Sequence, residues 1–105
     1  MKRNSWTPIV ELNDEHFPDW RESDLFALSN AMLGELGEFA NALKHSRGGG
    51  TKAVAVTQAD LVEELVDLWH YMVITLEILG QDEDSWADAV ARKVKMNHDR
   101  MEGRR

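Results

Sequence analysis

The chain has 105 residues, with 12 Lys and Arg against 19 Asp and Glu, so its formal net charge is −7. This length suits a single domain whose core would gain from oligomerisation. The absence of cysteine excludes disulfides, thiolate metal sites and a cysteine nucleophile, as is usual in a reducing compartment. The N-terminal apolar stretch is too short for a secretory signal, and the longest apolar run, at residues 71–79, is too short to span a membrane. We therefore expect a cytoplasmic protein without a membrane segment.

Charge is distributed unevenly along the chain. Residues 92–105 carry six basic and two acidic side chains, a net +4, so the remainder carries −11. Such an acidic body argues against binding a nucleic acid polymer, because the phosphate backbone would be repelled. The basic C-terminal stretch nevertheless allows a local contact with a phosphorylated ligand.

The pattern of apolar residues divides the chain into an N-terminal arm, residues 1–22, and a helical domain, residues 23–105. The arm contains both prolines and the aromatic residues Trp6, Phe17 and Trp20, without a clear helical period. The first helix is predicted from an N-cap at Ser23 to His45. Its apolar stripe comprises Leu25, Leu28, Met32, Leu36, Phe39 and Leu43. A glycine-rich segment at 48–50 ends it.

Two further helices are predicted. Thr57 and Asp60 form a capping-box pattern at the start of one, and Gly80 is placed to terminate it. Apolar residues surround most of this helix, so more than one neighbouring helix must cover it. The last helix is predicted from Asp84 or Ser85 to about residue 103, burying Trp86, Val90 and Val94. We therefore expect an all-α fold, an antiparallel helical bundle completed in a homodimer or homotetramer.

Four acidic residues form two helical pairs. Glu35 and Glu38 are three residues apart on the first predicted helix, as are Glu64 and Asp67 on the second. Because this spacing shares a helix face, antiparallel pairing would bring all four carboxylates together. Glycines at 34 and 37 each cost about 1 kcal/mol within a helix, so a close approach by a helix or ligand is expected there. For a single E-x-x-E pair, a solvated acidic face is the simpler interpretation.

The chemistry of these four side chains favours a hard metal ion. Carboxylates without His or Cys ligands suit Mg²⁺, with Mn²⁺ as a possible substitute. Mg²⁺ commonly bridges carboxylates to substrate phosphates and activates a water molecule, which is typical of phosphoanhydride hydrolysis. Di-iron bundles also use carboxylates but need Glu-x-x-His pairs, and neither Glu35 nor Glu64 is followed by His at that spacing.

The segments GELGEFANAL and EELVDLWHYMV resemble the E-x-x-E and E-x-x-D motifs of the all-α nucleoside triphosphate pyrophosphohydrolases. That family includes MazG, the dimeric dUTPases and deoxycytidine triphosphate pyrophosphatase. Tyr71 stands four residues after Asp67, where MazG-like proteins often have a tyrosine. The run Lys93, Asn97 and Arg100 resembles the family's K-x-x-x-N-x-x-R pattern. The resemblance covers residues 23–101.

The resemblance implies a role for each group of residues. Metal binding and catalysis would fall to Glu35, Glu38, Glu64 and Asp67, one of which could instead be a general base. Contacts to phosphate, sugar or base would come from Lys93, Asn97, Arg100, Tyr71 and Trp20. The three residues of the last helix are expected to form a polar stripe opposite Trp86, which could equally be a solvated face. Tyr71 could instead be a core aromatic, and Trp20, like Trp6, could anchor the arm to a partner subunit; His70 is expected to be structural.

In this interpretation the chain is a Mg²⁺-dependent pyrophosphohydrolase that converts a nucleoside triphosphate to the monophosphate and pyrophosphate, in a house-cleaning role. One alternative is a non-catalytic helical module that binds a nucleotide or a partner helix through the same groove. Another is a purely structural interaction protein, whose stability would not depend on Mg²⁺.

Overall fold

The computed structural model of the chain describes residues 4–46 and 56–103, and every element in these ranges is helical. The elements are α1 (Thr7–His16), a short 3-10 helix η1 (Trp20–Glu22), α2 (Leu25–Ser46), α3 (Gln58–Ile78) and α4 (Glu83–Met101). The predicted all-α class is thereby confirmed for the described part of the chain. The glycine-rich segment at 48–50 lies outside it. None of the described helices combines the length and apolar character needed to cross a membrane.

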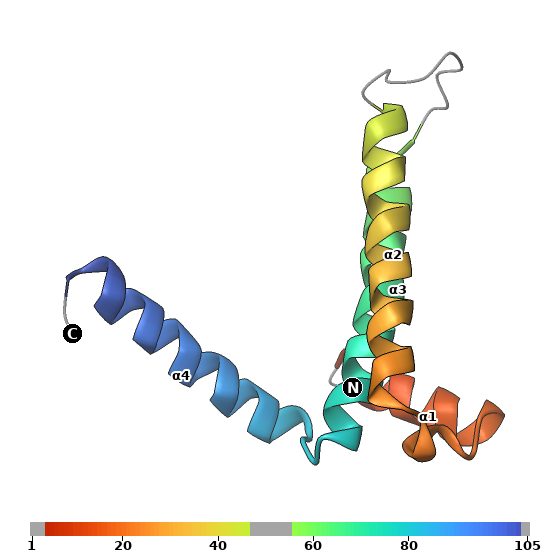
Figure 1. Cartoon of the computed structure of the whole chain (residues 1–105), viewed down its shortest axis with the longest axis horizontal. Helices are drawn as coiled ribbons and strands as arrows, with labels where there is room; N and C mark the ends of the chain where they lie inside the picture. The colour runs from red at the N-terminus through yellow and green to blue at the C-terminus, as the bar shows by residue number, and fades with distance from the viewer. Residues whose placement is uncertain (1–3, 47–55, 104–105) are drawn as a thin grey trace.

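Figure 1 shows how the helices are arranged. α2 and α3 lie side by side as an antiparallel hairpin, and α1 lies across the end where α2 begins and α3 finishes. α4 leaves from that same end and runs away from the hairpin. The α2–α3 hairpin is therefore the framework that fixes the relative positions of the predicted carboxylate pairs.

Local signals define the helix ends. At the start of α3, Thr57 Oγ1 accepts a hydrogen bond from the Asp60 backbone N–H at 3.1 Å, and Asp60 Oδ2 accepts from the Thr57 N–H at 3.0 Å. This confirms the predicted capping box. Asp82 and Ser85 form a second one, so α4 begins at Glu83, slightly earlier than predicted. The N-cap predicted at Ser23 is wrong by one residue, because the Asp24 carboxylate accepts from the Phe26 N–H and α2 begins at Leu25.

Gly80 ends α3 as predicted, with a φ of 83°. The Gly80 N–H donates to the Glu77 carbonyl and the Gln81 N–H to the Leu76 carbonyl, the two bonds of a Schellman motif. A side chain in this left-handed conformation is strained.

We expect Gly80→Ala to lower the free energy of unfolding by about 1–2 kcal/mol, because alanine pays the left-handed penalty that glycine avoids. Gly34→Ala is the matched control: this glycine lies within α2, and an added Cβ would meet nothing within 4 Å. The control should gain up to about 1 kcal/mol. Urea denaturation of the two variants measures both values, and an equal response would contradict the assignment of Gly80.

α1 is a helix that the periodicity of the sequence did not reveal. Asn4 Oδ1 accepts from the N–H groups of Trp6 and Thr7, and a proline occupies the first turn. The only fully buried residue of α1 is the polar Asn13, so its inward face carries no strong apolar repeat. The helix is held to α3 by aromatic residues: Trp6 Nε1 donates to Glu77 Oε2 at 2.8 Å, and the Trp6 ring meets Trp69 edge-on at 6.1 Å.

The apolar core lies at the end of the hairpin that α1 and η1 cover. Trp20, Leu28 and Ile74 are buried together there, and the adjacent Val73 is fully enclosed. The arm thus anchors to α3 of its own chain through Trp6 and Trp20. Farther along the hairpin, apolar side chains on the outer faces remain exposed, including Leu33, Leu36, Val62, Leu65 and Val66. One chain therefore leaves much of the apolar surface of α2 and α3 uncovered.

The predicted burial of α4 is wrong for a single chain. No residue of α4 is buried, and Val90 and Val94 are 41% and 61% exposed. Trp86 is half-buried, with its ring 6.3 Å from that of Trp69 at the root of the helix. The reason is the direction of α4, which takes the rest of the helix away from α2 and α3 (Figure 1).

Candidate metal centre

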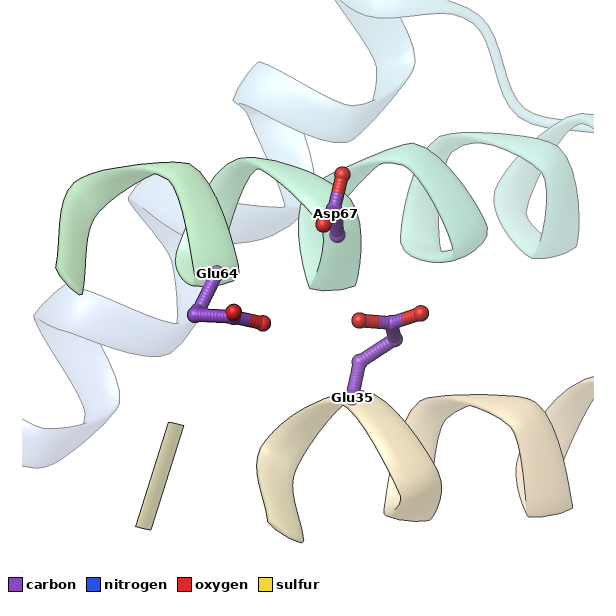
Figure 2. A group of neighbouring side chains, drawn as sticks. All are labelled: Glu35, Glu64 and Asp67. Atoms are coloured by element: carbon purple, nitrogen blue, oxygen red, sulfur yellow. The ribbon is translucent and has the colours of Figure 1, made fainter. Parts of the chain in front are cut away.

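The two carboxylate pairs meet between α2 and α3. One oxygen each of Glu35, Glu64 and Asp67 lie within 4.8 Å of one another, although the three residues come from two helices. In Figure 2, Glu35 and Glu64 point towards each other across the gap between α2 and α3, and Asp67 stands one turn farther along α3. The convergence expected from antiparallel pairing is therefore present in the structure.

Glu38 completes the group, although it is not one of the three residues whose oxygens all lie within 4.8 Å of one another. It is exposed one turn after Glu35, and its carboxyl group and charge raise the pKa values of both Glu35 and Glu64. In each case burial is the largest cause of the raised pKa, and Asp67 adds further repulsion. We refer to Glu35, Glu38, Glu64 and Asp67 as the carboxylate cluster.

The negative charge of the carboxylate cluster is not balanced by any cationic side chain of the described residues. Between residues 4–46 and 56–103, no Lys or Arg forms an ion pair with any of its four members. The Oε2 atoms of Glu35 and Glu64 are buried and have no hydrogen-bond partner. A buried unpaired oxygen costs roughly 1–3 kcal/mol, and neighbouring carboxylates repel unless a proton or a cation lies between them. The arrangement thus fits a cation.

The donor set fits a hard divalent ion. All four side chains offer oxygen, which suits Mg²⁺ or Mn²⁺. His70, the histidine of α3, contacts α1: its Nε2 lies 2.9 Å from Asn13 Nδ2, and burial lowers its pKa although the charge of Asp67 opposes that shift. The expectation of a structural role for His70 agrees with this contact to α1.

A cavity of about 470 Å³ lies at the covered end of the hairpin. Tyr71, one turn beyond Asp67 on α3, lines it together with Trp20, so two of the predicted ligand-binding residues share one cavity. Trp20 is only 4% exposed; its Nε1 donates to Asp14 Oδ1 at 2.8 Å, and Arg21 stacks on the ring at 4.0 Å. It serves as a fixed wall with one ring face occupied by Arg21.

Three other residues of this cavity were missed by sequence reasoning as parts of a site: Asn13, Phe17 and His70. Asn13 is 3% exposed, and its Nδ2 group lies within hydrogen-bond distance of both the Ile9 carbonyl oxygen and His70 Nε2. Asparagine is a poor helix former, so its presence inside a short helix was the only feature of the sequence that could have pointed to a specific role for Asn13. Its pairing with a residue 57 positions away could not be read from the sequence.

The predicted polar residues of α4 are not brought to the carboxylate cluster within one chain. Lys93, Asn97 and Arg100 lie on the helix that leaves the hairpin (Figure 1). Their expected position opposite Trp86 is also wrong. They follow Trp86 by 7, 11 and 14 residues, and at 3.6 residues per turn these intervals return to the same side of a helix.

Comparisons with known proteins leave the family of this chain undetermined. No protein-family model, curated protein or solved structure matches it. What the chain does must therefore be inferred from the carboxylate cluster, the neighbouring cavity and the position of α4.

Proposed function

We propose that this chain is a Mg²⁺-dependent nucleoside triphosphate pyrophosphohydrolase of the MazG-like type. It hydrolyses the α–β phosphoanhydride to a nucleoside monophosphate and pyrophosphate, and a house-cleaning role towards nucleotide pools accords with that reaction. The observation that carries the proposal is the pair of buried, unpartnered carboxylate oxygens on Glu35 and Glu64, in a group of four acids with which no Lys or Arg of the described residues forms an ion pair.

The carboxylate cluster would hold the ion, and the adjacent cavity would hold the nucleoside. A bound Mg²⁺ supplies Lewis-acid polarisation of phosphate oxygens and favours ionisation of a water molecule. A member of the cluster that is free of the ion can accept the proton of the attacking water. The water oxygen forms a bond to the α-phosphorus, the bond from this phosphorus to the bridging oxygen breaks, and pyrophosphate leaves with the electron pair.

The cavity supports a nucleoside as the ligand. Tyr71 and Phe17 offer aromatic faces at its wall, and Asn13 holds a fixed amide within it. Its volume of about 470 Å³ lies in the range of small-molecule sites. Tyr71 is one helical turn from Asp67, about 5.4 Å along the helix axis, so a nucleotide whose base occupies the cavity would have its phosphates within reach of the carboxylate cluster.

The test is a panel of ribo- and deoxyribonucleoside triphosphates with Mg²⁺, in which pyrophosphate and monophosphate are measured separately. Glu38→Gln removes one member of the carboxylate cluster, and Glu63→Gln is the matched control, because Glu63 is an exposed neighbour of Glu64 outside the cluster. Pyrophosphate from wild type and Glu63→Gln, but not from Glu38→Gln, is expected. Orthophosphate with diphosphate would mean that another bond is cut, and binding without turnover would favour the non-catalytic module.

Metal binding should also be visible without turnover. We expect Mg²⁺ to raise the melting temperature of the wild type, because an ion that binds only the folded state stabilises it, by about 2.7 kcal/mol at a hundredfold excess over its Kd. Glu38→Gln should reduce this rise and Glu63→Gln should retain it. Thermal unfolding followed by circular dichroism, with K⁺ at matched ionic strength, makes the measurement. An equal rise in all three proteins would contradict a metal site in the cluster.

A further inference from the structure

Asn13 is the only polar or charged residue that is buried in the described part of the chain, at 3% exposed, and it lines the cavity at the covered end of the hairpin. Its Nδ2 group donates to the Ile9 carbonyl oxygen at 2.8 Å and lies 2.9 Å from His70 Nε2. Both hydrogens of the amide nitrogen are therefore engaged. The contact with Ile9 also fixes the orientation of the amide, because turning it over would place Oδ1 against the Ile9 carbonyl oxygen.

The contact with Asn13 determines which nitrogen of His70 carries the proton. Because Nδ2 of Asn13 is a donor, Nε2 of His70 has to accept, so the ring is neutral with its proton on Nδ1. Burial lowers the pKa of His70 and favours the same neutral form, against the opposing charge of Asp67. Asn13 is thus held from two sides, by the backbone of α1 and by a side chain of α3.

The amide oxygen of Asn13 is left for a ligand. Within residues 4–46 and 56–103, no donor forms a hydrogen bond to Oδ1. The enclosed side-chain atoms without a partner in these ranges are Oε2 of Glu35 and Oε2 of Glu64, so Oδ1 of Asn13 is not enclosed, and the space that it faces is the cavity. The buried amide thus presents one fixed acceptor to an occupant of the cavity, while the donor of the same amide is already in use.

A fixed acceptor distinguishes nucleobases by the groups on their edges. An exocyclic amino group, as on cytosine or adenine, donates a hydrogen bond to Oδ1. A keto oxygen in the same place, as on uracil or hypoxanthine, meets Oδ1 oxygen to oxygen and leaves it without a partner. An asparagine usually adapts to a keto oxygen by offering its Nδ2 group, but in Asn13 this group is held by Ile9 and His70.

We propose that Asn13, positioned by His70, selects nucleotides whose base carries an exocyclic amino group over those with a keto oxygen in its place. This inference rests on the proposed function and names the class of base that the cavity takes. The aromatic faces of Phe17 and Tyr71 stack with any base. The discrimination therefore comes from the Asn13 oxygen, because a site built to hydrogen-bond one group rejects an analogue that leaves its buried polar atom unpaired.

Matched pairs of substrates test the proposal on the wild-type protein. dCTP and dUTP differ in having an amino group or a keto oxygen on the base, and dATP and dITP differ in the same way. We expect kcat/KM to be roughly ten- to a hundredfold higher for the amino member of a pair, the range that one unpaired buried acceptor produces. The preference is expected in each pair that the protein hydrolyses, and a pair with equal values or a keto preference overturns the proposal.

Two variants assign the preference to particular atoms. Asn13→Leu keeps a similar shape but has no acceptor, so the ratio of kcat/KM between dCTP and dUTP should fall towards one. His70→Phe frees the amide nitrogen of Asn13 to donate to a keto oxygen, so the ratio should fall because dUTP improves relative to dCTP. Ser23→Ala is the control, since Ser23 lines the same cavity, and it should keep the wild-type ratio. A merely structural role of His70 would lower both values together, and an unchanged ratio in His70→Phe overturns its assignment as a positioning residue.

Binding of dCMP and dUMP, measured by isothermal titration calorimetry, separates this proposal from the proposed function. Tighter binding of dCMP is expected. If the wild type bound dCMP more tightly than dUMP but hydrolysed no triphosphate, the role of Asn13 would stand and the proposed function would fail. Equal hydrolysis of dCTP and dUTP would support the proposed function and overturn the role of Asn13. If neither monophosphate binds and no triphosphate is hydrolysed, both are overturned.

Discussion

Glu64→Gln is expected to lower nucleoside triphosphate hydrolysis by about a thousandfold, because it removes a carboxylate from the candidate metal site and with it several kcal/mol of transition-state stabilisation. The same substitution should stabilise the metal-free protein at neutral pH. Glu64 is half-buried among three other acids, and its Oε2 atom has no partner. The neutral amide has nearly the same shape and lacks the charge that is repelled.

The pH dependence of stability provides an independent measurement. Burial and the neighbouring acids raise the pKa values of Glu35 and Glu64 above their ordinary value of 4.5. The folded state therefore binds protons more tightly than the unfolded state, and this stability is fully present below about pH 4.5 and is lost as the pH rises through the raised values. Metal-free wild type should show this loss in melting temperature, Glu64→Gln should show less of it, and Mg²⁺ should offset it at pH 7.

Glu63→Gln is the matched control for both measurements, since it removes one exposed negative charge from the same turn of α3. It should retain activity and most of the wild-type pH profile, because the charge of Glu63 is the smallest of the contributions that raise the pKa of Glu64. If Glu64→Gln were active, or if it destabilised the metal-free protein as a lost salt bridge would, the cluster would be a solvated acidic face or would hold a cationic side chain. Either outcome would remove the basis of the proposed function.

The features that sequence reasoning located are those set by neighbours in the chain. Thr57 with Asp60, and Gly80 after the last turn of α3, act over three or four residues. The carboxylate pairs are also local, because a spacing of three residues places both members on one face. Once α2 and α3 pack antiparallel, joined by a connection of about ten residues, few arrangements of the two carboxylate pairs remain. Their convergence was therefore predictable.

The features that sequence reasoning missed depend on distant contacts. α1 is held by Trp6 with Glu77, 71 residues apart, and by Asn13 with His70, 57 apart. The polar Asn13 on its inner face conceals the apolar period that marks a buried helix. The direction of α4 was not predictable either, because periodicity shows which side of a helix is apolar but not what covers it. The burial expected for Val90 and Val94 assumed a neighbouring element over α4, and residues 4–46 and 56–103 of one chain do not provide it.

Trp20→Ala is expected to have the largest effect on stability, a loss of about 3–5 kcal/mol. Trp20 is buried with Leu28 and Ile74 at the junction of η1, α2 and α3, and among the described residues the only other buried apolar side chains are Trp6 and Val73. Since a small domain has only about 5–15 kcal/mol in total, the variant should be partly unfolded at 37 °C. Urea denaturation followed by circular dichroism measures the loss.

Phe17→Ala is the control for this prediction, because Phe17 lines the same cavity but is 62% exposed. It should cost less than about 1 kcal/mol. If the cavity holds the nucleoside, Phe17→Ala should raise KM for the nucleotide with little change in kcat, since it removes a ring face and leaves the carboxylate cluster intact. A loss in Trp20→Ala no larger than in Phe17→Ala would show that the core lies elsewhere.

Trp20→Phe separates the hydrogen bond of Trp20 from its bulk. The Trp20 indole N–H, followed by Arg21, lowers the pKa of Asp14 below its ordinary value of 3.8. Because the folded pKa is the lower one, this stability is present above about pH 3.8 and is lost as the pH falls through the lowered value. Trp20→Phe keeps an aromatic ring in the core but removes the N–H donor. It should therefore retain most of the apolar packing, while its free energy of unfolding should fall less steeply than that of the wild type as the pH is lowered below about 3.8, the acid limb of the profile. An unchanged acid limb would assign the lowered pKa of Asp14 to Arg21 alone, and Arg21→Gln would then be the variant that flattens it.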